Sequence, residues 1–409
     1  MKQIKMNILI VSQYFWPESF QINNLAKSLV EKKIEVEVLT GKPNYPAGIF
    51  FDDYKFWGIK LDNYFGILVN RIPLLARGKG ALRLALNYLS FVFFGLLCAP
   101  FILRKKKYDV IFVYGVSPIL QAIPALFIGK LKKTPVIIWV QDLWPESLEA
   151  TGYIKNKKIL KAVSLIVRFI YRHADLLLVQ SEAFVEPVQL LAGTTPVKYY
   201  PNSPDVNFAS SSKISGTNIS GFDKKFPILF AGNIGSAQAV EVIVETATIL
   251  QKQQPDIHFI MLGDGSKRPW IKEQIQQRGL NNLDLPGKFP VETMPFFMQQ
   301  ASALLVTLAD QDIFSKTVPN KIQSYLASGR PILASLNGEG ARVITEAGAG
   351  LAVNANDVKG LARVCLELYN TSQEARNEMG KRGHNYYLEH YDHNQLIEDL
   401  IVHFESVAS

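Results

Sequence analysis

The stretch V-I-I-W-V-Q-D-L-W-P-E-S, residues 136–147, decides the fold. Its first five residues are apolar without alternation, as in a parallel strand that is covered on both faces. The residues that follow mark the end of such a strand and the start of a loop. Strand-like runs recur at 4–11, 36–39, 67–69, 110–113 and 176–179, and most of them are short and continuously apolar. Helix-length segments lie between them, at 20–32, 119–131, 157–172 and 182–191. This alternation predicts a doubly wound α/β sheet in the first half of the chain.

Residues 203–221 interrupt the alternation, because they are rich in serine and glycine and poor in apolar side chains. Such a composition predicts a connection or a surface loop. Strand-like runs then resume at 227–231, 257–262, 303–308 and 332–335. A chain of 409 residues is long enough for two domains of roughly 200 residues each. We therefore predict two Rossmann-like domains, with residues 1–203 in the first and 204–385 in the second.

Composition and charge narrow the class of protein. Hydrophobic residues make up 48% and charged residues 20%, which is typical of a globular chain. Cys98 and Cys365 are far apart and predict no disulfide framework, so we expect a reducing, intracellular compartment. Residues 1–201 hold 26 Lys and Arg against 14 Asp and Glu, whereas residues 202–409 hold 18 against 22. Only the first half is basic enough to favour an anionic partner surface.

Residues 82–103 are almost wholly apolar, and Arg104, Lys105, Lys106 and Lys107 follow them. This segment is either a buried helix with a solvated basic end or a helix that lies against anionic lipid. The basic charge of the same half favours the membrane. We expect peripheral association with the cytoplasmic face of a bacterial plasma membrane. Nucleic acid is not an expected partner, since the sequence has no nucleic-acid-binding motif.

Several familiar sites are missing from the sequence. No G-x-G-x-x-G follows the first strand, and there is no P-loop lysine motif, so neither a nicotinamide cofactor nor an NTPase is indicated. The six histidines do not have metal-ligand spacing. We expect no cofactor and no protein-bound metal.

The tetrapeptide W-P-E-S occurs twice, at 16–19 and 144–147, each time just beyond a predicted strand. Ligands of open parallel sheets bind beyond the carboxyl ends of the strands. A shared helix start explains the proline and glutamate. It explains less well two tryptophans beside carboxylates, which we expect to be exposed and to suit sugar rings and hydroxyls. The predicted acceptor-binding residues, including those of a third loop at 40–48, are Tyr14, Trp16, Asn44, Tyr45 and Trp144.

Three segments of the second half predict a phosphate site. The glycine-containing loops after two strands supply Gly232, Asn233, Gly235, Gly263 and Asp264. Backbone N–H groups in such loops can hold a phosphate, although a tight turn alone also requires glycine. The segment S-K-T-V-P-N-K, residues 315–321, is more specific. A lysine in the first turn of a helix is unfavourable unless an anion shares the site, so Lys316 and Lys321 are predicted to flank a diphosphate.

The order and spacing of several short segments resemble the family 4 glycosyltransferases, which are retaining enzymes of GT-B fold. The segments are Y-P-N-S-P-D at 200–205, F-A-G-N at 230–233, L-G-D-G at 262–265 and Y-L-A-S-G-R-P at 325–331. The resemblance covers essentially the whole chain and implies two Rossmann-like domains facing a cleft. It also implies that the C-terminal helix, residues 386–409, returns to the first domain. The first-half loops look like a bacterial subgroup of O-antigen and capsule synthesis that includes N-acetyl-L-fucosamine transferases.

The sequence departs from the family at its usual functional positions. Gln141 stands where the family has a histidine. Asn233 and Gln238 replace an arginine and a lysine that hold the donor phosphates. The two glutamates of the family's E-x7-E motif align with Lys316 and Ser324. We interpret Lys316 and Lys321 as the substitute phosphate ligands.

The resemblance implies retaining transfer of a sugar from a UDP-sugar to a lipid-linked glycan, with an acetamido sugar as one candidate. Base and ribose would meet Lys288, Phe289, Glu339 and Glu346. Ser315, Asn320 and Lys321 would stabilise charge on the leaving diphosphate. Glu18, Asp142 and Glu146 are the predicted catalytic residues, which orient the acceptor hydroxyl or take its proton.

Three alternatives remain open from the sequence. A UDP-sugar 2-epimerase shares the two-domain fold, although the apolar segment 82–103 speaks against it. A non-catalytic, membrane-associated subunit of polysaccharide assembly would explain the replaced family residues. A nucleic-acid-binding protein would use the basic half of the chain.

Overall fold

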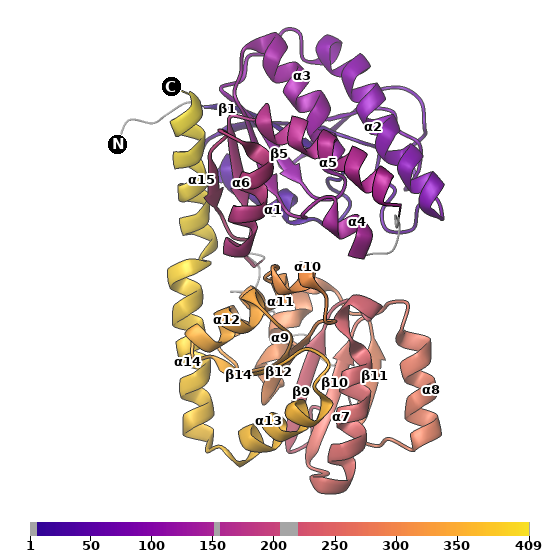
Figure 1. The fold of residues 1–409 in the computed structure, drawn as a ribbon, viewed down its shortest axis with the longest axis vertical. Helices are drawn as coiled ribbons and strands as arrows, with labels where there is room; N and C mark the ends of the chain where they lie inside the picture. The colour runs from indigo at the N-terminus through magenta and orange to yellow at the C-terminus, as the bar shows by residue number, and fades with distance from the viewer. Residues whose placement is uncertain (1–5, 151–155, 205–219, 409) are drawn as a thin grey trace. The chain divides into compact units, whose positions relative to one another are not determined.

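The computed structural model describes residues 6–150, 156–204 and 220–408 (Figure 1). The chain folds as two compact units. The first unit comprises the residues up to Pro201 together with those from Asn394 onward, and the second unit spans Asn202–His393. The division falls two residues before the predicted domain boundary at 203/204. The predicted serine-rich connection at 203–221 lies mostly outside the described residues.

The first unit is built on an eight-stranded sheet with the order β3-β4-β2-β1-β5-β6-β7-β8. All neighbouring strands are parallel except β3, which runs antiparallel to β4. The strands are β1 Asn7–Ser12, β2 Glu35–Thr40, β3 Lys60–Tyr64, β4 Ile67–Arg71, β5 Val110–Gly115, β6 Val136–Val140, β7 Leu176–Val179 and β8 Val197–Tyr199. The central strands are buried along their length, as their continuous apolar runs predict.

Helices cover both faces of this sheet (Figure 1). The α-helices of the first unit are α1 Gln21–Glu31, α2 Ala81–Ile102, α3 Ala122–Lys132, α4 Glu146–Ala150, α5 Lys157–Arg172, α6 Val185–Ala192 and α15 His393–Ala408. Short 3-10 turns lie at η1 Ile119–Gln121 and η2 Glu182–Phe184. Apolar side chains of α1 and α15 join one core cluster with the sheet. Helices α2, α3, α5 and α6 form a contacting row.

The last helix, α15, belongs to the core of the first unit. Its buried residues Leu396, Leu400 and Phe404 recur every four positions and so form one face. The Tyr200 hydroxyl donates a hydrogen bond of 2.9 Å to the Leu396 carbonyl. We expected the returning helix to begin at 386, but residues 386–390 continue a helix of the second unit, and α15 begins at His393.

The second unit holds a parallel sheet with the order β11-β10-β9-β12-β13-β14. Its strands are β9 Phe226–Ala231, β10 Ile257–Leu262, β11 Leu283–Gly287, β12 Ala303–Thr307, β13 Ile332–Ser335 and β14 Gly350–Val353. Its α-helices are α7 Val240–Gln253, α8 Arg268–Arg278, α9 Met294–Gln300, α10 Asp312–Ser315, α11 Asn320–Ser328, α12 Glu339–Glu346, α13 Val358–Asn370 and α14 Gln373–His390. Short 3-10 turns lie at η4 Ser236–Gln238 and η5 Val291–Thr293.

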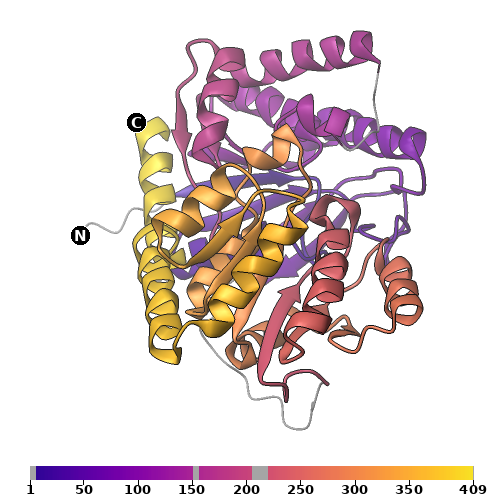
Figure 2. The ribbon, with the colours of Figure 1, turned by 60° about the horizontal axis from the view of Figure 1, so that its bottom comes forward.

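Two core clusters sandwich the sheet of the second unit. Helices α7 and α13 pack on one face, and α9, α11 and α12 pack on the other (Figure 2). Both sheets are thus doubly wound, with helices on either side.

Candidate active site

The strand order of the second unit reverses between β9 and β12. At such a switch point the loops beyond the two strands diverge and leave room for a ligand. Helix α11 is fastened beside this point by the Tyr325 hydroxyl. That oxygen accepts from the Ala231 N–H at 3.1 Å, at the end of β9, and donates to the Leu305 carbonyl of β12 at 3.3 Å. The start of α11 is therefore held close to the loop that follows β9.

Lys321, in the first turn of α11, extends toward that loop. Its Nζ is shielded from solvent and finds no hydrogen-bond partner among the described residues, although the residue as a whole is half-buried. The Nζ lies 3.6 Å from the centre of the Phe230 ring. Burial lowers the pKa of the Lys321 ammonium to about 7. The ring supplies a cation–π contact, but a buried ammonium without a hydrogen-bond partner or counter-ion is a group that an anion would stabilise further.

Gly232 makes the position of Lys321 possible. A Cβ at residue 232 would lie 2.6 Å from Cε of Lys321, and the backbone φ there is +133°. The loop after β10 packs equally closely on the other side, because a Cβ on Gly263 would lie 1.8 Å from the Gly232 carbonyl oxygen. The Gly232 N–H donates to the Leu262 carbonyl at 2.8 Å. The glycines predicted for phosphate binding thus form two loops packed backbone to backbone.

The remaining polar groups of these loops are engaged locally. The Asn233 amide donates to Gln238 at 3.2 Å, and the two residues are those that replace the family's arginine and lysine. Asp264 is exposed and accepts from the Gly265 N–H at 2.9 Å. Gly235 is buried beside Asn233, whose Nδ2 would lie 2.8 Å from a Cβ there. None of these contacts reaches Lys321.

The loop after β12 carries the other predicted donor ligands. A Cβ on Gly338 would lie 1.9 Å from the Ser315 carbonyl oxygen, so this loop touches the one after β13. The Ser315 hydroxyl donates to the Asp312 carbonyl of its own turn at 2.7 Å. Lys316 is half-buried. Asn320 is exposed, and its side-chain Oδ1 accepts from the Asn202 side-chain amide at 2.8 Å.

Glu339 and Glu346, predicted to meet the nucleoside, share one partner. Arg342 donates to the two Glu339 oxygens at 3.1 and 2.8 Å and to Glu346 at 2.7 Å. Lys288 is exposed just after β11. Phe289 packs against Phe297, with ring centres 5.1 Å apart, and so contributes to the core. Arg342 was not among the predicted site residues, although its i,i+3 and i,i+4 spacing from the glutamates signals the pairing.

The first unit has its own switch point, between β1 and β5. The Gln13 N–H, at the end of β1, donates to the Gln121 side chain at 2.6 Å. The Gln13 amide nitrogen donates to Asn87 of α2 at 2.7 Å. The Gln13 amide oxygen and the Gln141 amide nitrogen are both buried without a hydrogen-bond partner among the described residues. These two groups can therefore accept from and donate to a bound hydroxyl.

Glu18 joins two of the predicted acceptor loops. Its carboxylate is buried and accepts from the backbone N–H groups of Asn44 and Tyr45, each at 2.7 Å. Burial outweighs these bonds and raises the pKa of the Glu18 carboxyl to about 7. Glu18 thus fastens the loop after β1 to the loop after β2.

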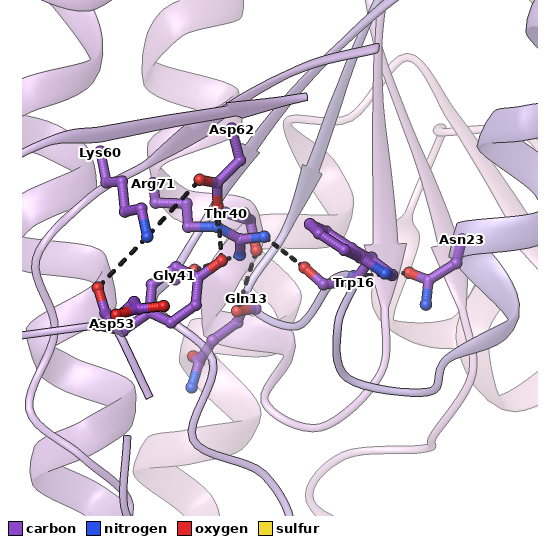
Figure 3. Close-up of polar contacts among 10 residues, drawn as sticks. Gln13, Trp16, Asn23, Thr40, Gly41, Asp53, Lys60, Asp62 and Arg71 are labelled. Atoms are coloured by element: carbon purple, nitrogen blue, oxygen red, sulfur yellow. Dashed lines mark hydrogen bonds and ion pairs between the residues drawn. The ribbon is translucent and has the colours of Figure 1, made fainter. Parts of the chain in front are cut away.

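Arg71, which was not among the predicted site residues, contacts the same two loops (Figure 3). The side chain is fully buried at the end of β4 and forms an ion pair with Asp62 of β3. It also donates to the backbone carbonyls of Trp16 and Gly41, the latter at 3.2 Å. An arginine that closes an apolar strand signals a buried pair, but the sequence does not identify its partner.

Asp142, after β6, accepts from the Ser117 N–H and hydroxyl, both at 2.9 Å. Burial raises the pKa of the Asp142 carboxyl. The Trp144 indole donates to the same Ser117 hydroxyl at 2.9 Å. Glu146 is exposed and opens α4. The second W-P-E-S motif therefore begins a helix, whereas the first lies ahead of α1.

The expectation of two exposed tryptophans is wrong. Trp16 is 37% exposed, but Trp144 is only 4% exposed because its indole is hydrogen-bonded inward to Ser117. Tyr14 is also buried and stacks on Phe20, with ring centres 5.1 Å apart. Asn44 is buried as well, and its side chain bonds the backbones of Lys42 and Arg77. Tyr45 is half-buried. Trp16, Tyr45, Asp142 and Glu146 are thus the acceptor-side candidates that solvent reaches.

Two doubly wound units, each with polar loops at its switch point, define a protein of the GT-B class. The comparisons with known proteins agree. Residues 19–202 match the family model described as "Glycosyl transferase 4-like domain", and residues 225–371 match "Glycosyl transferases group 1". Together the two models match well over half of the chain. Both matched stretches are glycosyltransferase domains, and the chain is a glycosyltransferase of GT-B fold.

Curated relatives of the chain are glycosyltransferases by name, and solved structures share its fold. It is 25% identical to WcaI of Escherichia coli, named as a colanic acid biosynthesis glycosyl transferase, over 79% of this chain and 82% of that one. It is 23% identical to a 2-deoxystreptamine N-acetyl-D-glucosaminyltransferase of Niallia circulans, over 63% and 66% of the two chains. Among solved structures, Anabaena HepE in complex with UDP has a TM-score of 0.67 at 13% identity, covering 98% of this chain and 100% of the other. A UDP-forming trehalose-phosphate synthase of Burkholderia xenovorans has a TM-score of 0.73 at 12% identity, covering 99% and 100%.

Proposed function

We propose that this glycosyltransferase moves a sugar, with retention of configuration, from a UDP-sugar to a lipid-linked glycan of surface polysaccharide synthesis. The observation that carries the proposal is the buried, unpartnered ammonium of Lys321 at the switch point of the second unit. A diphosphate there would supply the missing counter-charge. It would also meet the N-terminal turn of α11, which has no side-chain cap.

UDP is the nucleotide we propose, because one solved structure of the same fold contains UDP and another is named UDP-forming. An acetamido sugar is favoured by the name of the Niallia circulans relative. The name of the Escherichia coli relative, which refers to colanic acid biosynthesis, favours a role in polysaccharide synthesis. We propose that the enzyme works at the cytoplasmic face of the plasma membrane, where a lipid-linked acceptor would be found.

In the transfer, the acceptor oxygen forms a bond to the anomeric carbon while the bond from that carbon to the diphosphate breaks. The electron pair of the broken bond goes to the departing phosphate oxygen. Lys321 stabilises this developing charge. The acceptor proton goes to the phosphate on the same face of the sugar, so no covalent nucleophile is needed. The transfer proposed here uses no metal ion.

On the acceptor side, we propose separate tasks for the three predicted catalytic carboxylates. Glu146 and Asp142 orient the acceptor hydroxyl, and the unpartnered amide groups of Gln13 and Gln141 bond neighbouring hydroxyls. Glu18 acts by holding the loops, since its side chain is buried and its carboxylate accepts the N–H groups of Asn44 and Tyr45 on the neighbouring loop.

The test is calorimetric titration of UDP and of UDP-N-acetylhexosamines into the full chain. Lys321→Met keeps the length and apolar stem of the side chain but removes its charge. Because hydrogen bonds to charged groups contribute about 1.5–3 kcal/mol, we expect a ten- to hundredfold loss of affinity. The matched control is Lys272→Met, which removes an exposed lysine on α8 of the same unit.

The control should bind UDP as the unmodified protein does. Unchanged UDP affinity in a folded Lys321→Met variant would remove Lys321 from the site. A folded wild-type protein that bound no uridine nucleotide would refute the proposed donor.

A further inference from the structure

Helix α2 carries a continuous apolar stripe on its outer face. The six exposed residues are three or four positions apart and therefore share one face: Leu82, Leu86, Leu89, Phe93, Leu97 and Phe101. Their exposed fractions range from 39% to 74%. Large apolar stripes of this kind on soluble proteins mark sites of interaction with another surface.

The neighbouring helices extend the apolar surface. Helix α3 contacts α2 and α5, so the three helices lie side by side. Phe127 and Leu131 are exposed on α3. Ile159, Leu165, Ile166 and Phe169 are exposed on α5. We call the outer face of α2, α3 and α5 the apolar face.

The charged residues of the three helices that form the apolar face are all basic. Helices α2, α3 and α5 contain no aspartate or glutamate. Helix α5 alone carries Lys157, Lys158, Lys161, Arg168 and Arg172. A helix with apolar residues on one side, basic residues beside them and no acidic residues is typical of a helix that lies in the interface of an anionic membrane.

The inner face of α2 shows that this helix lies along the unit and is part of its packing. By length and composition alone, α2 is the one helix of the described chain that could cross a membrane. However, Asn87 and Phe91 are fully buried in the unit, and a Cβ on Gly95 would lie 2.8 Å from Pro124 of α3. A helix packed in this way can present one face to lipid without spanning it.

The same turn of α2 reaches the acceptor loops. Asn87 accepts from the Gln13 amide at 2.7 Å, and the Tyr88 ring lies 6.4 Å from that of Trp144. Leu86 and Leu89, which flank these residues in sequence, are on the exposed stripe. Because a helix with its side chains is only about 10–12 Å across, a lipid surface on the stripe would lie within one helix diameter of the acceptor loops.

We propose that the apolar face of α2, α3 and α5 docks on an anionic lipid bilayer and brings the acceptor loops to the membrane surface. Trp57, 69% exposed, lies with its ring centre 5.8 Å from that of Phe94 on α2 and supplies an exposed aromatic group beside this helix. The surplus of basic residues selects lipid over a second copy of this chain, because two such faces would repel each other. The inference deepens the proposed membrane location, but it does not depend on which sugar is transferred.

The experiment is flotation of the full chain with vesicles of phosphatidylcholine alone or with phosphatidylglycerol added. One variant carries Lys157→Ser, Lys158→Ser and Lys161→Ser, and its matched control carries Lys252→Ser, Lys272→Ser and Lys359→Ser on exposed positions of the second unit. A second variant carries Leu89→Ser and Phe93→Ser, and its control carries Leu388→Ser and Val402→Ser, which are also exposed.

We expect binding only to vesicles that contain the anionic lipid. Each basic residue near such a surface strengthens binding about fivefold, so the triple α5 variant should bind roughly a hundredfold more weakly. The α2 variant should also lose binding, and both controls should retain it. UDP affinity, measured in parallel, should be unchanged in all four variants, so failure of this inference is distinct from failure of the donor site.

Three results would overturn the proposal. The wild-type protein could fail to bind anionic vesicles, or either variant could bind as well as its control. Light scattering could instead show a dimer that the α2 variant dissociates, which would assign the apolar face to a second copy of the chain.

Discussion

The buried ammonium of Lys321 should make the unliganded protein less stable than it would be without the charge. In the folded protein the pKa of Lys321 is about 7, against 10.5 for an exposed lysine. Because the pKa of Lys321 is lower in the folded protein, burying its charge costs free energy. This cost is largest below pH 7 and disappears as the pH rises past 10.5. Lys321→Met removes the penalty and should therefore stabilise the unliganded protein.

The size of this effect follows from the difference in pKa. Each pKa unit corresponds to 1.36 kcal/mol, so the variant should gain about 4 kcal/mol at pH 7 and only about 1 kcal/mol at pH 10. The same linkage predicts that a bound diphosphate raises the pKa of Lys321, so that the side chain takes up a proton when the nucleotide binds. Above pH 7.5 the affinity for a UDP-sugar should fall by nearly tenfold for each pH unit, with uptake of up to one proton on binding.

Two assays check this reasoning. Urea unfolding of the wild-type and Lys321→Met proteins, at pH 7 and pH 10, reports the difference in stability and its decline with pH. Calorimetry in two buffers of different ionisation enthalpy reports proton uptake. A variant that is less stable than wild type at pH 7, or nucleotide binding without proton uptake at pH 8, would refute the account of Lys321.

Three further predictions concern the loops. The pKa of Glu18 is raised to about 7 in the folded protein, so the free energy of unfolding of the wild type should fall by about 3 kcal/mol as the pH rises from 4.5 to 7. Thermal melts of Glu18→Gln should lack this fall. Arg71→Met leaves the Asp62 carboxylate without its arginine and should lower the free energy of unfolding by about 3–5 kcal/mol in urea titrations, whereas an unchanged midpoint would contradict the role given to Arg71. Gly263→Ala places a Cβ 1.8 Å from the Gly232 carbonyl oxygen at a φ of +149°, so the two loops must move apart. UDP affinity measured by calorimetry should therefore fall at least tenfold. Normal binding would contradict the role given to the packing of these loops.

The fold could be predicted from the sequence where strands are buried on both faces. Runs such as 136–140 are continuously apolar, and β6 has the expected bounds. The edge strands could not be predicted in the same way. Strand β3, Lys60–Tyr64, is polar and half-solvated, and β11 contains Pro286, which an edge strand tolerates. Their pairing depends on neighbours that are distant in sequence.

The sequence singled out Lys321, whose ammonium the structure buries, and its role in donor binding stays a prediction. The acceptor loops were less predictable. Lys321 stood out because a lysine in a first helical turn needs an anion. The sequence did not show that Trp144 would turn inward to Ser117, since the two residues are 27 positions apart. Nor did it show that Arg71 would hold the carbonyls of Trp16 and Gly41. The identical sequence of the two W-P-E-S motifs predicted equivalent roles for them, but their tertiary contacts differ.

The central claim is that the chain transfers a sugar from a UDP-sugar, with Lys321 stabilising the leaving diphosphate. The most direct measurement is the release of UDP from a panel of radiolabelled UDP-sugars in the presence of lipid extract from a polysaccharide-producing bacterium, for wild type and Lys321→Met. We predict that one donor transfers label to the lipid fraction with release of UDP, and that Lys321→Met slows this transfer by tenfold or more. The claim is contradicted if folded wild-type protein releases no UDP from any donor, if it only epimerises the donor without an acceptor, or if Lys321→Met transfers label at the wild-type rate.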